Sequence, residues 1–107
     1  MSAEGIVFAK RFLPFLDNDS QRTILLYYGL ICNDDGLFWP SMADVSIETG
    51  KSERAIRRTS KELENYGLLA IKPSWREDGS QKSNYYQLLL TLSPREFLKQ
   101  RRGSRIM

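Results

Sequence analysis

Histidine is absent from this sequence of 107 residues, and cysteine occurs once, at Cys32. The absence of histidine removes the commonest general base and the commonest metal ligand of proteins. The seven glycines form neither the GxGxxG nor the GxxxxGK[ST] pattern that indicates a nucleotide-binding loop. We therefore expect a protein that is not an enzyme and that has no metal, no cofactor and no small-molecule ligand.

Long apolar segments are missing as well. The run from Ile24 to Cys32 is far shorter than the ~20 residues needed to cross a bilayer. The first ten residues, MSAEGIVFAK, lack a basic leader before a long apolar segment, so we expect no secretion signal. A lone cysteine makes neither an intrachain disulfide nor a four-ligand zinc site, and Cys32 is expected to be a small buried hydrophobe. These features favour a cytoplasmic protein without membrane contact.

The charge balance is only slightly basic, because 16 Lys and Arg against 13 Asp and Glu give a net charge of +3. A net charge of this size steers a partner weakly, so the placement of the cations decides the function. The length and the hydrophobic content of 41% suit a single domain over residues 1–107. We expect its core at about residues 17–92, after an N-terminal lead over residues 1–16 and before a C-terminal helix and basic tail over residues 93–107.

Apolar residues at helical spacing predict helices over residues 20–32, 42–49 and 53–66. Candidate N-caps precede them, namely Asp17 or Asp19, Ser41 and Ser52. Only Gly50, Lys51 and Ser52 separate the last two helices, and two helices joined by a short glycine-containing turn form a helix-turn-helix unit. Gly67 supplies the left-handed position that ends the last of these helices.

The segments before and after these three helices have other patterns. Residues 1–16 carry apolar side chains without a clean period, and Pro14 discourages a helix, so a short strand or extended lead and then an irregular turn are expected. Two strand-like runs, residues 68–75 and 84–91, flank the loop REDGSQKS with its Asp78–Gly79 turn, which predicts a hairpin. Ser93 and Pro94 then begin a final helix. The expected fold class is α+β, mostly helical.

Four cations share one side of the helix expected at residues 53–66. With Ile56 at zero and about 100° per residue, Leu63 falls within about 20° of it, whereas the cations fall between about 100° and 200°. These four residues are Arg54, Arg57, Arg58 and Lys61. The helix thus has an apolar face and a cationic face. A solvated surface is the ordinary explanation of such a face, so its surroundings must decide.

The segment PSMADVSIETGKSERAIRRTSKELENYGLL resembles the winged helix-turn-helix domains of bacteria, phages and plasmids. It is most similar to the group found in replication initiators and small regulators of mobile elements, and the resemblance spans roughly residues 20–90. It implies a hairpin wing behind the helix-turn-helix, and DNA binding in transcription regulation or replication initiation. Two departures are Ser60, where an apolar residue is usual, and Ser46, where alanine is usual. We expect Ser60 to bond back to the Ile56 carbonyl and Ser46 to be tolerated.

A helix held from behind by a second helix fits the major groove of B-form DNA, where arginine grips guanine edges or phosphates. Lys51 and Lys61, at its flanks, suit phosphate contact. The expected DNA-binding residues lie in the turn, the cationic helix and the wing loop, and they are Lys51, Ser52, Glu53, Arg54, Arg57, Arg58, Lys61, Arg76, Gln81, Lys82 and Ser83. The expected partner is double-stranded DNA, which would make the protein nucleoid-associated.

Several aromatic residues have two interpretations. Trp39 and Trp75 could stack on exposed bases, but packing into the core is the favoured interpretation. Tyr85 and Tyr86 alternate along a strand, so one is expected inward and the other outward.

Other classes of function and assembly stay open. A winged helix can instead use its cationic surface to bind an acidic protein. DNA-binding domains of this kind often act as homodimers, and a dimer would form through the N-terminal apolar residues or the final helix.

Overall fold

The computed structural model describes residues 3–75 and 77–99, apart from the side chains of residues 81–83. The elements follow in the order α1 (Ala3–Phe12), the 3-10 helix η1 (Leu13–Phe15), α2 (Asp19–Ile31), β1 (Leu37–Phe38), α3 (Met42–Thr49), α4 (Glu53–Asn65), β2 (Leu69–Trp75) and β3 (Gln81–Leu88). Residues 94–99 are helical as well. The chain is thus an α+β protein in which helix outweighs strand, as the sequence predicts.

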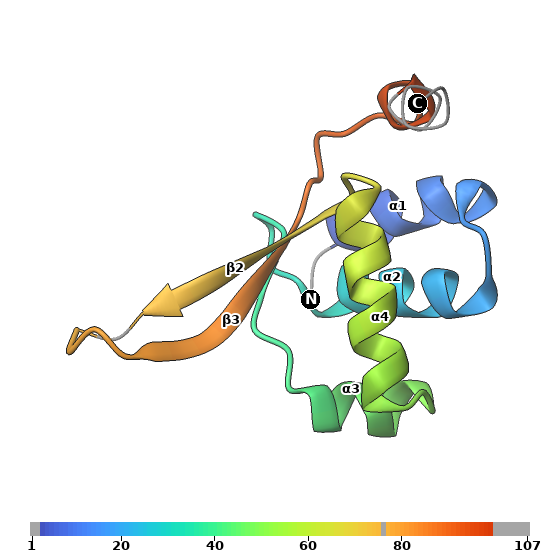
Figure 1. The fold of residues 1–107 in the computed structure, drawn as a ribbon. Coiled ribbons are helices and arrows are strands. Elements are labelled where there is room, and N and C mark those ends of the chain that lie inside the picture. Colours follow the sequence, from blue (N-terminus) through green and yellow to red (C-terminus); the bar gives the residue numbers. More distant parts are fainter. Residues whose placement is uncertain (1–2, 76, 100–107) are drawn as a thin grey trace, which may run out of the picture.

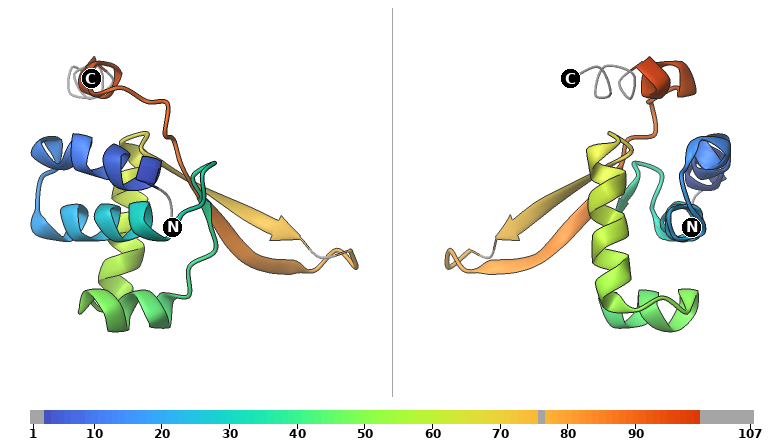
Figure 2. Two further views of the ribbon diagram at one scale, coloured as in Figure 1. Left: turned by 180° about the vertical axis from the view of Figure 1, so that it is seen from behind. Right: turned by 45° about the vertical axis from the view of Figure 1, so that its right-hand side comes forward.

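The helices form a body from which the β2–β3 hairpin projects (Figure 1). Helices α1 and α2 pack side by side, α4 crosses them, and α3 lies across the N-terminal end of α4 (Figure 2). Residues 94–99 lie at the opposite end of α4 from α3 (Figure 1). This arrangement leaves the long side of α4 that faces away from α2 uncovered.

The prediction of an extended lead over residues 1–16 was wrong, because α1 occupies most of this segment. Its buried residues are Gly5, Phe8, Ala9 and Phe12, which recur at helical spacing once glycine and alanine are counted as part of the packed face. Pro14 does not interrupt α1, since it lies in the first turn of η1, where proline is tolerated. The hydrophobic core therefore begins before residue 17, because Phe8, Ala9 and Phe12 belong to it.

Helices α1 and α2 approach each other at two glycines. A Cβ added to Gly29 would lie 2.4 Å from the carbonyl oxygen of Gly5, and one added to Gly5 would lie 2.3 Å from the carbonyl oxygen of Gly29. Such distances are far below van der Waals contact. The two helix backbones pack this closely because neither position carries a side chain.

The predicted helix boundaries on either side of the turn are confirmed within one residue. The side chains of Ser41 and Ser52 accept hydrogen bonds from the backbone N–H groups of Asp44 and Ala55 and so cap α3 and α4. Gly50 adopts a left-handed φ of 75° between the two helices. Ser46, which replaces the usual alanine, stabilises this turn, because its hydroxyl donates to the Lys51 carbonyl over 2.6 Å. Asn18, rather than Asp17 or Asp19, caps α2.

The sheet has the strand order β1-β3-β2, and both pairings are antiparallel. The hairpin of β2 and β3 was predicted, although β3 begins at Gln81 and therefore includes residues assigned to the loop. The short strand β1 was not predicted, and it pairs Leu37 with Gln87 and Phe38 with Tyr86. A bulge interrupts the β2–β3 register between Lys72 and Ser74.

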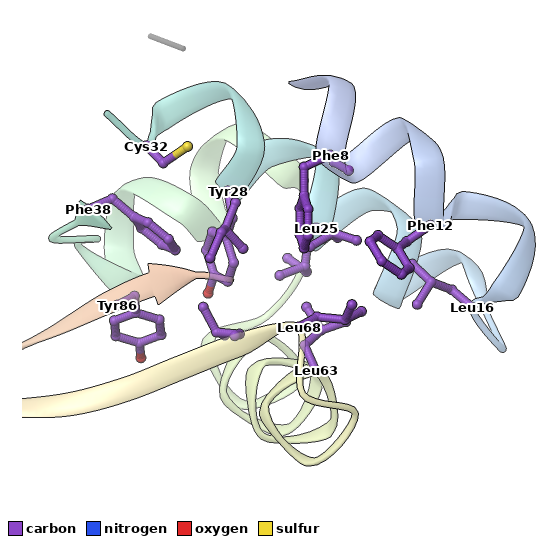
Figure 3. Packing of buried hydrophobic residues seen from close by; sticks show 14 of the residues in the cluster. Phe8, Phe12, Leu16, Leu25, Tyr28, Cys32, Phe38, Leu63, Leu68 and Tyr86 are labelled. Carbon is purple, nitrogen blue, oxygen red and sulfur yellow. The ribbon is translucent and has the colours of Figure 1, made fainter. Parts of the chain in front are cut away.

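The core lies between α1, α2, α4 and the base of the sheet (Figure 3). Phe8 and Phe12 of α1 approach Leu25 of α2, while Phe38 and Tyr86 of the sheet close the other end beside Tyr28 (Figure 3). Cys32 is fully buried, as predicted. Tyr86 points inward and Tyr85 is half-buried, which matches the predicted alternation.

The helical segment at residues 94–99 belongs to this core through Phe97. Its ring lies edge-on to Phe12 and to Tyr66, with centroid distances of 5.3 Å and 6.0 Å. The Ser93 hydroxyl accepts from the Glu96 N–H and begins the segment, as the sequence predicts. The expected basic tail at residues 100–107 lies outside the described residues.

Buried polar groups connect α2 to α4. The expected bond from Ser60 to the Ile56 carbonyl is replaced by a contact between the hydroxyls of Ser60 and Tyr28, 2.7 Å apart and both buried. Burial raises the pKa of Tyr28 well above its ordinary value, although the bond to Ser60 opposes this. Further along the same interface, buried Gln21 donates to Glu62 over 3.1 Å.

Within residues 3–75 and 77–99, none of the helices has the length and apolar character that crossing a membrane requires.

Candidate nucleic-acid interface

Helix α4 separates an apolar face from a cationic face. Ile56 and Leu63 are completely buried, and Thr59 and Ser60 are buried beside them against α2. On the outward side, four cationic side chains are exposed, namely Arg54, Arg57, Arg58 and Lys61, and they form what we call the cationic surface. Packing of the apolar face fixes the rotation of α4, so these four side chains project together into solvent.

Two members of the cationic surface have acidic partners. Arg57 Nη2 lies 3.4 Å from Glu53 Oε1, and Lys61 Nζ lies 3.1 Å from Glu64 Oε1. In contrast, Arg54 and Arg58 form no ion pair with any residue in the described part of the chain. They stand one turn apart, so both guanidinium groups are available to an external anion without breaking an existing pair.

Glu64 connects the cationic surface to the hairpin. Its Oε2 accepts from the Ile71 N–H of β2 over 3.1 Å while its Oε1 pairs with Lys61. Partial burial disfavours ionisation, but hydrogen bonds from Lys61 and Ile71 outweigh it and hold the pKa of Glu64 below its ordinary value. The carboxylate therefore stays charged at neutral pH and fixes the base of the hairpin to α4.

The turn residues in the predicted site have mixed placements. Lys51 is half-buried, whereas Ser52 and Glu53 are exposed at the N-terminus of α4. The hydroxyl of Ser52 is engaged as the helix cap. Exposed backbone N–H groups and the positive end of the helix dipole favour anions at this position.

The predicted hairpin residues fall in two groups. Gln81, Lys82 and Ser83 belong to strand β3 rather than to the loop, and their side chains lie beyond what the structure describes. Arg76 lies outside the described residues. The Asp78–Gly79 turn is held by the Ser80 hydroxyl and N–H, which donate to Asp78 Oδ1 over 2.6 Å and 3.0 Å.

The sequence analysis omitted Asn65, which is exposed in the last turn of α4. On the helical ruler used above it falls at about 180°, in line with Arg54 and Arg58. Its amide offers both a donor and acceptors, the combination that recognises adenine edges. The signal was its angular position, and Asn65 was missed because only cations were considered for the outward side of the helix.

The expectation that both tryptophans pack into the core was wrong. Trp39 is 60% exposed and Trp75 is 61% exposed. Trp39 directly follows the short strand β1, and Trp75 is the last residue of β2, in the hairpin that projects from the helices (Figure 1).

Two acidic residues of α3, Asp44 and Glu48, affect Tyr27 of α2. Burial, together with the negative charges of Glu48 and Asp44, raises the pKa of Tyr27 on α2. The two carboxylates are therefore close to Tyr27.

The sequence matches no protein-family model, and it matches no curated protein. One solved structure that resembles the fold is described as the N-terminal domain of a DNA binding protein. The similarity has a TM-score of 0.52 with 17% sequence identity, and it covers 100% of this chain and 86% of that chain. The α+β arrangement of helices and a small antiparallel sheet is thus shared with a solved domain.

Proposed function

We propose that this protein binds double-stranded DNA in a sequence-specific manner as a winged helix-turn-helix domain. Helix α4 would lie in the major groove, with α3 across its N-terminal end and the β2–β3 hairpin as the wing along the adjacent backbone. The function is binding without catalysis. The likeness to a domain described as part of a DNA binding protein supports this class of function.

The dimensions and chemistry of α4 suit the groove. A helix of 13 residues is roughly 20 Å long and about 10–12 Å wide with its side chains, close to the width of the major groove. Arginine forks bind guanine edges or phosphate oxygens through two hydrogen bonds. Arg57 and Lys61 would exchange their carboxylate partners for phosphates, which fixes the position of the helix on the duplex.

The observation that carries the proposal is the pair Arg54 and Arg58. Both are exposed on the outward side of a helix whose rotation is fixed by burial of Ile56 and Leu63. Neither has an acidic partner in the described part of the chain. Two exposed guanidinium groups in register on one helix face can bind an anionic ligand without first breaking an ion pair.

Selection of bound duplexes from a random pool provides the target for the test. Replacement of Arg54 or Arg58 by alanine is expected to cost about 1–3 kcal/mol of binding free energy, roughly 5- to 150-fold in Kd, if each contacts a base. The Arg54→Ala/Arg58→Ala double variant should lose both affinity and sequence preference, measured by fluorescence anisotropy with selected and scrambled duplexes.

A matched control removes the same charge elsewhere. Lys10 and Arg11 are exposed on α1, so Lys10→Ala/Arg11→Ala lowers the net charge equally without touching α4. This control is expected to bind nearly as tightly as the unmodified protein. Equal losses in the two double variants, or unchanged affinity in the α4 variant, would refute the proposal.

Salt dependence separates DNA from an acidic protein partner. Contacts with several phosphates release counterions, so log Kd should rise steeply and linearly with log salt concentration. Lys61→Ala should weaken binding evenly across sequences and reduce this slope by about 1. A shallow slope, with no duplex enriched from the random pool, would favour an acidic protein as the ligand.

We further propose a role in transcription regulation or replication initiation of a bacterium or mobile element, at the nucleoid. A homodimer on paired half-sites is the associated proposal, and a palindromic selected site would support it. Analytical ultracentrifugation with and without the duplex measures the stoichiometry directly.

A further inference from the structure

The outer face of the sheet carries a row of side chains that lies outside the cationic surface of α4. Lys72 of β2 and Tyr85 of β3 are register partners, and Trp39 follows directly after β1. We call Trp39, Tyr85 and Lys72 the aromatic row. The rings of Trp39 and Tyr85 are 6.2 Å apart between centroids with an interplanar angle of 37°.

The row faces away from the core. Phe38 and Tyr86, the chain neighbours of Trp39 and Tyr85, are register partners and are both buried. Because successive residues of a strand point to opposite faces, Trp39 and Tyr85 lie on the other side of the sheet from α4. Trp39 keeps 60% of its surface exposed even though Tyr85 lies against it.

We propose that the aromatic row binds unpaired bases of single-stranded nucleic acid. The exposed ring of Trp39 and the half-buried ring of Tyr85 beside it offer π-faces on which bases stack, and a neighbouring cation attracts the phosphate chain. Lys72 is exposed and forms no ion pair with any residue in the described ranges. The adjoining register row of Leu37, Gln87 and Ala70 is itself uncharged, and the nearby acidic residues Asp34 and Asp35 lie past Gln87, away from Lys72.

A proline-rich peptide is the other ligand that exposed aromatic rings recognise. Lys72 beside the rings favours a polyanion over a neutral peptide, because its positive charge attracts phosphates and finds no opposite charge on a neutral peptide. The site is separate from the cationic surface of α4. Lys72 and Tyr85 belong to the hairpin that is proposed as the wing, whereas Trp39 lies outside the hairpin, so Trp39 variants can separate single-strand binding from the proposed duplex binding.

The test uses the full chain and a short oligothymidylate, with an abasic oligomer of equal length as the matched control ligand. The sequence has two tryptophans, so a Trp75→Phe background leaves Trp39 as the single reporter of indole fluorescence. Oligothymidylate is expected to quench this fluorescence, whereas the abasic oligomer, with the same charge but no bases, leaves it nearly unchanged.

Variants identify the rings as the cause. Trp39→Ala is expected to raise the Kd for oligothymidylate by roughly five- to hundredfold in an anisotropy assay, and Trp39→Phe to restore part of the affinity. Trp39→Ala should leave affinity for the selected duplex unchanged. Ile47→Ala, which truncates a side chain on α3 that is 79% exposed, is the control for loss of exposed apolar surface and should change neither affinity.

Four results would overturn the inference. Absence of measurable oligothymidylate binding at low salt is the first, and equal binding of the abasic oligomer is the second. Loss of single-strand binding in Arg54→Ala/Arg58→Ala but not in Trp39→Ala would place the site on α4. Quenching by a proline-rich peptide without oligothymidylate binding would assign the aromatic row to a protein partner.

Discussion

The hydroxyl pair of Tyr28 and Ser60 should set the strength with which α4 is held against α2. The two oxygens are 2.7 Å apart, and both residues are almost completely buried, at 0% and 1% exposure. Ser60→Ala leaves the Tyr28 hydroxyl buried without this partner, which costs about 1–3 kcal/mol. Alanine recovers roughly 0.5 kcal/mol through its higher helix propensity. The expected net loss is about 0.5–2.5 kcal/mol in the free energy of unfolding.

Removal of the other hydroxyl, that of Tyr28, should destabilise the protein less. In Tyr28→Phe, the Ser60 hydroxyl can turn back to the Ile56 carbonyl one turn earlier, so the loss should stay below about 1 kcal/mol. The double variant removes both polar groups. Its free energy of unfolding should therefore be lower than that of Tyr28→Phe by at most a few tenths of a kcal/mol. The single losses therefore exceed the double loss by about 1 kcal/mol, the signature of a direct interaction.

Urea denaturation followed by circular dichroism measures the four free energies of unfolding in this cycle. For a domain of this size each kcal/mol also shifts Tm by about 4–8 °C. Additive losses, with no coupling between the two substitutions, would refute the reasoning. Duplex binding should weaken as well, because an α4 that is held less firmly against α2 presents its cations in a less defined direction.

Two further predictions concern packing and pH. Gly29→Ala should destabilise the protein by about 1–3 kcal/mol in urea denaturation, because its Cβ would lie 2.4 Å from the Gly5 carbonyl oxygen, whereas an unobstructed helical glycine would gain up to about 1 kcal/mol from the same change. The lowered pKa of Glu64 means that its ionised form contributes stability that is complete above the ordinary value of 4.5 and is lost as pH falls through the folded pKa. Glu64→Gln should therefore lose less stability than the unmodified protein on acidification below 4.5, and parallel pH profiles would contradict this.

Local signals account for what the sequence predicted well. The caps at Ser41 and Ser52 and the glycine between them are short-range features, and they set the boundaries of α3 and α4 within one residue. The cationic surface follows from the same helix, since the angular positions of its residues are fixed once the helix and its buried face are known. Local chemistry thus predicted the two helices α3 and α4, the turn between them and the side of α4 that faces solvent.

Long-range partners account for what was missed. Helix α1 was misread because Gly5 and Ala9 belong to its packed face, and small residues become a helix face only when a second backbone is known to lie close by. Ser60 pairs with a residue 32 positions away instead of one turn away. Strand β1 exists through its pairing with β3, and the exposure of Trp39 follows from that pairing.

The bulge in the hairpin has a consequence for contact between copies of the protein. Strand β2 is an edge strand, and its outer row of backbone groups could template pairing with another chain. Pro73 lies within the bulge between Lys72 and Ser74 and has no amide hydrogen to donate. The bulge and Pro73 therefore hinder another chain from pairing with the exposed edge of β2, which disfavours aggregation of the hairpin.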